Sequence, residues 1–152
     1  MTNPQSSRLP VFLVANAGLH SDFMILHVAA AALASETKAM AMPHSVDSIP
    51  TSANQEDYVS MGMSAARRLA AMLENVRSVV AIELLAASQG LDFLMPLRTG
   101  SQAQKAYERV RSSSKLVEVD RSLTRDIAVV SDLIEAGKIL ETPQPDRRRS
   151  DS

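Results

Sequence analysis

The side chains best suited to chemistry lie between His44 and Gly62, where Gln55-Glu56-Asp57 follows a proline and several small hydroxyl and amide residues. A carboxylate at such a place can accept hydrogen bonds or exchange a proton. The pattern alone favours a simpler interpretation, because acids in the first turn of a helix are stabilised by the helix dipole. Ser52 and Gln55 also have the spacing of a capping box, which predicts that a helix starts here.

Other kinds of chemical site have little support in the sequence. The histidines His20, His27 and His44 are too scattered for a metal-ligand pattern, so we expect ordinary loop or interface histidines. The absence of cysteine excludes disulfides, thiolate nucleophiles and cysteine-based zinc sites. Ser60 and Ser88 have no base at a predictable spacing, so nucleophilic catalysis is not predicted.

The charge balance and the apolar runs exclude two classes of partner. The chain has 16 Lys and Arg against 17 Asp and Glu, and its net charge of -1 would not concentrate nucleic acid or an anionic membrane surface. The longest apolar run, Phe23 to Ala34, contains His27 and is shorter than the roughly 20 residues of a membrane span. Met1 to Ser7 is polar, unlike a secretory signal. We therefore expect a soluble, cytoplasmic protein.

Two long helices are predicted on either side of the polar stretch. The first runs from Asp22 to about Met40, with Ser21 as its N-cap, and is apolar on nearly every face. The second runs from Gln55 to Gly90 as its C-cap and carries two apolar faces over about 35 residues, or roughly 50 Å. Two apolar faces require two neighbours, so this length predicts an oligomer or a chain that is part of a larger fold.

Shorter elements are predicted around the two long helices. Pro4 and Pro10 make the segment from Thr2 to Gly18 irregular. A short helix is expected from Ser101 to about Val110, and a last one from Asp120 to about Ala136 with Gly137 as its C-cap. Aromatic residues make up only 3% and strand-like alternation is rare, so the expected fold class is all-α.

The run Ser-Val-Asp-Ser-Ile-Pro-Thr-Ser-Ala-Asn-Gln-Glu-Asp at residues 45–57 closely resembles the histidine ammonia-lyases of the aromatic amino acid lyase superfamily. Further similar segments follow in the family order, at residues 9–14, 18–25, 31–36, 81–93 and 120–121. The resemblance implies a long-helix bundle fragment of the lyase fold, with residues 1–137 as its C-terminal helical portion and 138–152 as a disordered tail. In that family the long helices form the centre of a homotetramer, so we expect a homo-oligomer or association with a missing N-terminal portion.

The resemblance also implies one wall of a substrate pocket. Glu56 matches the family glutamate near the substrate imidazole, and we expect it to be the catalytic residue of this chain. Gln55 matches its polar neighbour and Met24 a residue on the apolar side, which makes both substrate-binding candidates. The implied substrate is L-histidine, deaminated to urocanate and ammonia, because related lyases for phenylalanine or tyrosine carry Asn-Gln-Asp or similar in place of Gln-Glu-Asp.

The chain departs from the family pattern at five positions. His20, Asp22 and His27 stand where the family commonly has Asn, Gly and Gln, and Ala17 and Tyr58 stand where Gly and His are common. The Asp22 carboxylate would add a negative charge close to the implied pocket wall.

The family's electrophile, a methylidene-imidazolone (MIO), is made from an internal Ala-Ser-Gly triad. The nearest segments here, Ala34-Ser35-Glu36 and Ala87-Ser88-Gln89, have no glycine, so the sequence predicts that this chain forms no cofactor and is inactive alone. Two functions stay open at this point. The chain is the C-terminal part of a histidine ammonia-lyase, or it is a non-catalytic remnant or helical interaction module.

Overall fold

The computed structural model describes residues 4–46 and 48–140, and these ranges contain helices and no strand. The elements in chain order are α1 (Pro4–Ser7), η1 (Val11–Leu13), α2 (Asp22–Met40), η2 (His44–Val46), α3 (Gly62–Phe93), α4 (Ser101–Ser113) and α5 (Thr124–Glu135). The predicted all-α class is therefore confirmed. Residues 141–152, most of the predicted tail, lie outside the described residues, and Ile139 just before them packs against the core.

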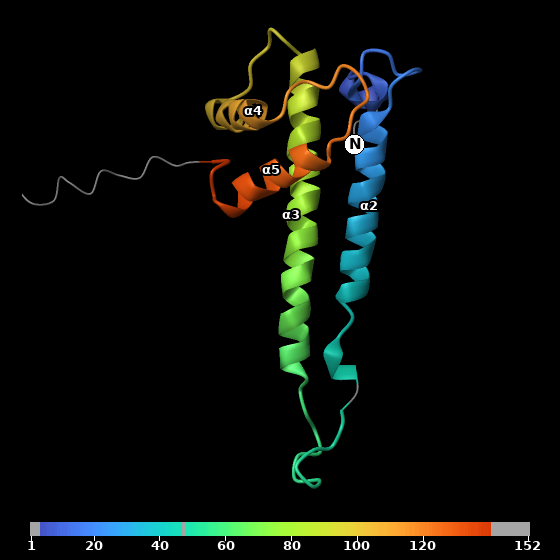
Figure 1. Ribbon diagram of the computed structural model, residues 1–152, viewed down its shortest axis with the longest axis vertical. Coiled ribbons are helices and arrows are strands. Elements are labelled where there is room, and N and C mark those ends of the chain that lie inside the picture. The colour runs from blue at the N-terminus through green and yellow to red at the C-terminus, as the bar shows by residue number, and fades with distance from the viewer. Residues whose placement is uncertain (1–3, 47, 141–152) are drawn as a thin grey trace, which may run out of the picture.

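Helices α2 and α3 form an antiparallel hairpin, with α4 and α5 packed beside one half of α3 (Figure 1). Helix α3 has 32 residues, and its rise of 1.5 Å per residue makes it roughly 48 Å long. The molecule therefore has a broad head, which contains the N-terminal segment, α4 and α5, and a narrow stalk, which consists of the other half of the hairpin. The loop that joins α2 to α3 extends beyond the end of the stalk (Figure 1).

The predicted bounds of α2 are confirmed, but the predicted start of α3 is wrong. Helix α3 begins at Gly62, seven residues after Gln55, and the expected capping box does not form. Ser52 has a φ of 54°, which is incompatible with the extended backbone of an N-cap residue. The Gln55 N–H donates instead to the Ser52 oxygen at 3.2 Å, inside a turn that the paired backbones of Thr51 and Glu56 close.

The predicted end of α3 is also wrong, because Gly90 lies inside the helix. The helix continues to Phe93, and Gly90 is buried beneath the N-terminal segment. A Cβ atom at this position would lie 3.2 Å from Cδ1 of Leu9, closer than carbon atoms normally approach. Glycine at position 90 therefore allows the N-terminal segment to pack closely on α3, and it does not end the helix.

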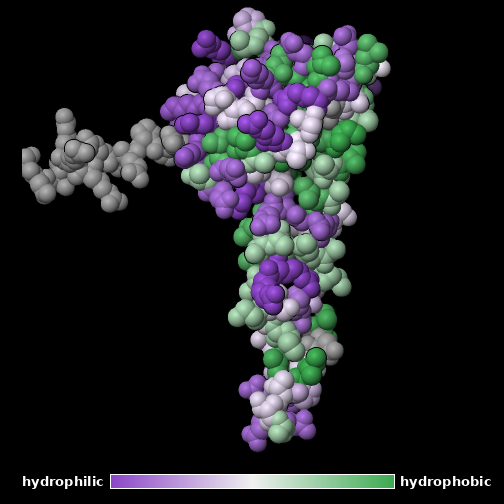
Figure 2. Space-filling model, viewed as in Figure 1, coloured by the Kyte–Doolittle hydropathy of each residue, from purple (hydrophilic) through white to green (hydrophobic). Residues whose placement is uncertain are grey.

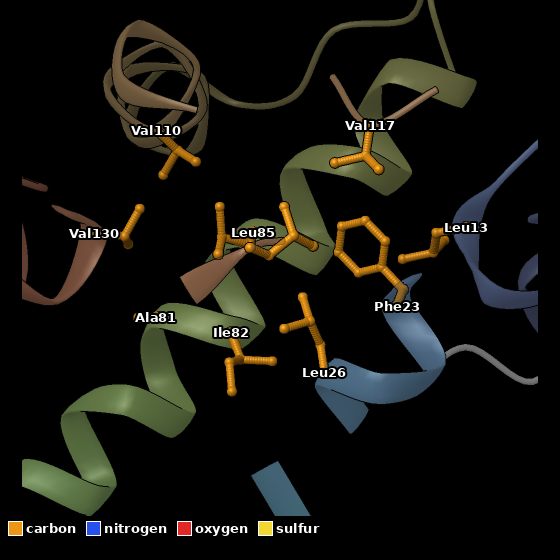
Figure 3. Packing of buried hydrophobic residues seen from close by; sticks show 10 residues of the cluster. Leu13, Phe23, Leu26, Ala81, Ile82, Leu85, Val110, Val117 and Val130 are labelled. Carbon is orange, nitrogen blue, oxygen red and sulfur yellow. The ribbon is translucent and has the colours of Figure 1, made fainter. Parts of the chain in front are cut away.

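The hydrophobic core lies in the head, around the last third of α3. Leu85 of α3 lies between side chains of the N-terminal half of the chain and those of α4 and α5 (Figure 3). The buried members of this core are Leu13, Phe23, Leu26, Ala81, Ile82, Leu85, Val110, Val117, Leu123 and Val130. Because all described segments of the head contribute to one cluster, the core holds together elements that are far apart in sequence.

A buried side-chain amide connects three of these segments. Gln89 of α3 is 0% exposed, and its Nε2 donates hydrogen bonds to the backbone oxygens of Leu13 at 3.1 Å and Val117 at 2.8 Å. Its Oε1 accepts hydrogen bonds from the Val117 N–H and from Nη2 of Arg111, both at 3.2 Å. The amide thus satisfies backbone groups on either side of α3 that cannot reach water.

An ion pair extends this network to α4. Nη2 of Arg111 lies 2.5 Å from Oδ2 of Asp92, and Oδ1 of Asp92 accepts a hydrogen bond from the Tyr107 hydroxyl at 2.6 Å. This hydrogen bond to a carboxylate raises the pKa of Tyr107, because it stabilises the protonated phenol, and burial acts in the same direction. Helix α4 is therefore attached to α3 by polar contacts as well as by Val110.

The last helix starts later than predicted. Helix α5 begins at Thr124 rather than Asp120, because the Asp120 carboxylate accepts a hydrogen bond from the backbone N–H of Ser21 at 3.0 Å. This contact holds the connection between α4 and α5 against the start of α2. Gly137 ends the helix as predicted, one position after the C-cap residue Ala136: it has a φ of 67°, and its N–H donates to the oxygen of Ile134.

The predicted end of α4 and the predicted absence of a helix in the N-terminal segment are also wrong. Helix α4 continues past Val110 to Ser113, with the Ser112 hydroxyl bonded to the Arg109 oxygen at 2.7 Å. The segment from Thr2 to Gly18 contains the one-turn helix α1, in which Pro4 occupies the first position, where its missing N–H has no helical partner in any case.

One helix among the described residues, Phe23–Met40 of α2, is long and apolar enough by length and composition to cross a membrane. Core helices of proteins without a membrane span have the same length and apolar composition.

Replacing Gln89 by leucine should destabilise the head strongly. The leucine fills a similar volume but leaves the Leu13 and Val117 backbone groups buried without partners, at an expected cost of about 2 to 4 kcal/mol. Thermal unfolding followed by circular dichroism measures the effect, and Gln102→Leu on the exposed face of α4 is the matched control. Equal melting temperatures for the two variants would contradict the proposed contribution of the Gln89 hydrogen bonds to the stability of the head.

Because of Asp126, the head should become less stable as the pH falls into the acidic range. Hydrogen bonds from Arg121 and the Ser114 hydroxyl hold the pKa of Asp126 below its usual 3.8. Since the folded-state pKa is depressed, the stabilisation is present above about pH 4 and is lost as the pH falls through the folded-state value. The melting temperature of Asp126→Asn should lie below that of the parent at pH 6, and the gap should close toward pH 2.5. Asp132→Asn, at an exposed position on the same helix, is the matched control.

Candidate functional site

The candidate site lies in the loop between η2 and α3, which folds back on itself at its tip. The Thr51 N–H donates to the Glu56 oxygen at 2.9 Å, and the Glu56 N–H donates to the Thr51 oxygen at 3.3 Å. Between them, Ser52, Ala53 and Asn54 have φ values of 54°, 55° and 66°. Three consecutive left-handed residues without glycine are costly, at roughly 1 to 2 kcal/mol each. The paired backbone of Thr51 and Glu56 maintains this turn.

Ser48 closes the base of the same loop. Its hydroxyl accepts a hydrogen bond from the Val59 N–H at 2.8 Å and donates one to the Asp57 oxygen at 3.3 Å. One side chain therefore bridges the incoming and outgoing arms of the loop. The segment that carries Gln55 and Glu56 is held at two levels, by Ser48 at the base and by Thr51 at the tip.

Arg68 joins the start of α3 to the end of α2. Its Nη1 donates to the backbone oxygens of Met40 at 2.6 Å and Met42 at 3.1 Å, which are the unpaired carbonyls at the end of α2. The same residues line a groove of about 380 Å³ that also includes His44. A cation at this position satisfies the helix end and complements its negative dipole end.

The predicted site residues in the loop are exposed in the described chain. Gln55, Glu56 and Asp57 are all exposed, and Glu56 has no ion pair with any residue that the structure describes. The side-chain contact of Glu56 is with Thr51, whose Oγ1 donates to Oε2 of Glu56 at 3.3 Å. The carboxylate is therefore accessible and still free to accept further hydrogen bonds.

Met24, the third predicted site residue, lies at the opposite end of the hairpin. It is on the first turn of α2 and 38% exposed, whereas Gln55 and Glu56 lie beyond the other end of that helix (Figure 1). The 16 steps from Met24 to Met40 alone correspond to roughly 24 Å of helical rise. Within one copy of the chain, the structure does not bring Met24 together with Gln55 and Glu56.

An apolar groove lies beside α2 and α3 at the head, away from the loop. It has a volume of about 720 Å³ and is mostly apolar, with Leu9, Leu13, His27, Ile82, Glu83 and Leu94 among its lining residues. None of Met24, Gln55 and Glu56 lines it. The histidines of the described residues also form no cluster that could hold a metal ion.

The residues that order the loop were missed from the sequence. Ser48 and Thr51 bond to backbone groups that are brought near only by the return of the chain. Arg68, which joins α3 to the end of α2, lies 26 residues from its partner Met42. The polar run that contains Ser48 and Thr51 indicated a polar loop, but nothing in the spacing indicated which hydroxyl bonds to which partner.

Residues 1–112 match the family described as aromatic amino acid lyase. The chain belongs to the aromatic amino acid lyase family. It is 59% identical over 121 residues to a protein named histidine ammonia-lyase from Legionella pneumophila (strain Corby), covering 80% of this chain and 24% of the relative. This aromatic amino acid lyase chain thus spans about a quarter of the length of the curated relatives that it matches.

Solved structures of lyase-family members have the same arrangement of helices. The crystal structure of histidine ammonia-lyase from Trypanosoma cruzi matches with a TM-score of 0.85 and 52% identity, covering 90% of this chain and 27% of that one. The structure of a tyrosine aminomutase from Streptomyces globisporus matches with a TM-score of 0.79 and 38% identity, covering 87% and 25%. The predicted resemblance to the lyase fold is confirmed.

The exposed apolar side chains of α2 and α3 should make this lyase chain self-associate. Ile25, Val28, Leu69 and Leu73 are between 53% and 60% exposed, and apolar residues are visible along the stalk in Figure 2. Exposed apolar side chains along both helices favour association. Sedimentation velocity should show species larger than one chain.

The double variant Leu69→Glu/Leu73→Glu should shift these species toward the monomer, because the charges resist burial. Ser64→Glu on the same helix is the control for added charge. A monodisperse monomer of the parent chain would contradict the prediction.

Proposed function

We propose that this chain forms the C-terminal helical part of a histidine ammonia-lyase, which deaminates L-histidine to urocanate and ammonia in histidine catabolism. The observation that carries the proposal is the Gln55-Glu56-Asp57 loop, which presents an accessible carboxylate on a backbone held by Ser48 and Thr51. The 59% identity to a protein named histidine ammonia-lyase supports the same reaction. The proposed location is the cytoplasm.

Glu56 is the proposed catalytic residue of this chain. Its carboxylate can accept a hydrogen bond from the imidazole N–H of the substrate or exchange a proton with the ring. A phenyl ring would leave a buried carboxylate without a partner, which is unfavourable. The acid therefore favours a histidine substrate over an apolar aromatic one. Gln55 is proposed to bind the substrate beside it.

The pocket is proposed to form between chains. Glu56 and Met24 lie at opposite ends of one hairpin, so a pocket that contains both requires a second copy of the chain or another part of the enzyme (Figure 1). The exposed apolar faces of α2 and α3 supply a surface for that association. The proposed assembly is a homo-oligomer with the long helices at its centre, completed by a portion that corresponds to the rest of the relatives.

The residues of this chain do not fit the role of precursor for the MIO electrophile that the family implies for complete enzymes. The 152 residues contain no Ala-Ser-Gly, and Ser35 and Ser88 lie within the regular helices α2 and α3. Ser88 is buried, and its neighbour Gln89 is bonded to the backbone on two sides. Activity therefore depends on a polypeptide portion that supplies the triad.

A second candidate is a helical interaction module without catalysis. The exposed apolar side chains of the stalk favour it, because they would bind partner helices whether or not a pocket forms. The two proposals differ in one respect, which is whether Glu56 is needed for turnover.

Co-expression with the complementary portion of the Legionella pneumophila relative tests the proposed function. Urocanate formation from histidine is expected in the complex and not with the chain alone. Glu56→Ala should lower kcat in the complex by about a hundredfold or more, the range of general acid–base catalysis. Glu74→Ala, an exposed acid of α3, is the control.

Three outcomes would count against parts of this proposal. Turnover by the chain alone would refute the account of the electrophile. An unchanged rate in Glu56→Ala would remove the role of that carboxylate. A complex that forms without turnover would favour the interaction module.

A further inference from the structure

Thr51 and Glu56 form a directly opposed, hydrogen-bonded pair at the tip of the loop. Their backbones exchange two hydrogen bonds, at 2.9 and 3.3 Å, as in a narrow antiparallel bridge. Side chains of such a pair lie on the same face of the two strands and can contact each other. Here they do, because Oγ1 of Thr51 donates to Oε2 of Glu56 at 3.3 Å.

The Glu56 side chain needs such a contact to hold one orientation. It is exposed, and within the described residues no ion pair restrains it. Fixing a glutamate side chain costs roughly 1.5 to 2 kcal/mol in rotamer entropy. Threonine is a suitable partner, because its branched Cβ restricts χ1 and so presets the direction of the hydroxyl. A hydrogen bond to a charged acceptor is also stronger than a neutral one.

We propose that Thr51 is a positioning residue for the Glu56 carboxylate. Its hydroxyl occupies Oε2 and leaves Oε1 to face the substrate imidazole. Ser48 supports the pair from the base of the loop, where it joins the Val59 N–H to the Asp57 oxygen. This inference rests on the proposed function of Glu56, because positioning has a catalytic consequence only where that carboxylate meets the substrate.

Two substitutions separate the hydroxyl from the shape of the side chain. Thr51→Val keeps the branched shape and removes the donor, whereas Thr51→Ser keeps the donor and loses a methyl group. In the co-expressed complex, Thr51→Val should lower kcat/KM about tenfold, a loss of 1.4 kcal/mol in transition-state stabilisation. Thr51→Ser should remain within about threefold of the parent. Ser52→Ala is the matched control, since it removes the neighbouring hydroxyl.

Coupling to Glu56 distinguishes positioning from general support of the fold. In a Glu56→Ala background the carboxylate acceptor is absent, so Thr51→Val should have no additional effect on kcat/KM. Equal losses in Thr51→Val and Thr51→Ser, or a full tenfold loss in the Glu56→Ala background, would overturn the inference. A strong effect of Glu56→Ala with none of Thr51→Val would overturn it too, and would leave the proposed function intact.

Hydrogen–deuterium exchange of the 152-residue chain supplies a readout that needs no turnover. Loss of the side-chain contact should loosen the bridge, so Thr51→Val should raise amide exchange in peptides that cover residues 48–60 several-fold, and Thr51→Ser should not. Equal exchange in the two variants would overturn the inference about Thr51, whether or not the complex is active. An inactive complex would refute the proposed function separately.

Discussion

The head of the molecule depends on the hydrogen bonds of one buried side chain, Gln89. A helix as long as α3 satisfies its own backbone, but the segments that pack on it are irregular and have backbone groups left to pair. Gln89 pairs the Leu13 oxygen on one side and both backbone groups of Val117 on the other. The same amide oxygen accepts from Arg111, whose ion pair with Asp92 attaches α4. One buried amide therefore links the N-terminal segment, α3, α4 and the connection to α5.

The stalk and its loop are organised by different forces. In the stalk, α2 and the short η2 pack against α3, and many apolar side chains are exposed, so the stability of the stalk as a single chain comes from few contacts. The loop at its end has no buried residue between positions 48 and 61 and is ordered by short-range hydrogen bonds of Ser48 and Thr51. This division matches the proposed roles: the head is a self-contained support, whereas the stalk and loop present surface and an acid to other chains.

The distance between Met24 and Glu56 gives the assembly a functional meaning. Residues at the two ends of a rigid hairpin cannot converge by side-chain motion, since α2 keeps them apart by its own length. If both line a pocket, association between copies is part of the catalytic arrangement and not only a source of stability. The exposed apolar faces would then be covered by the same contacts that complete the pocket.

The sequence alone determined the all-α class, the bounds of α2, the end of α5 at Gly137 and the resemblance to the lyases, because these depend on local patterns. Periodicity, glycine placement and a run of thirteen specific residues can all be recognised in the sequence without knowledge of tertiary contacts. It also singled out Gln55 and Glu56, by resemblance.

Only the tertiary structure decided that α3 starts at Gly62, that Gly90 is a packing site and that Asp120 binds the start of α2. The last two depend on partners far away in the chain, and the first depends on a turn that pairs residues five positions apart. Glu56 pairs with Thr51 instead of opening a helix, Leu9 approaches Gly90 from 81 positions away, and the Ser21 N–H takes the Asp120 carboxylate. Local signals cannot anticipate such partners, because the competing hydrogen bond or contact exists only once the chain has folded back on itself.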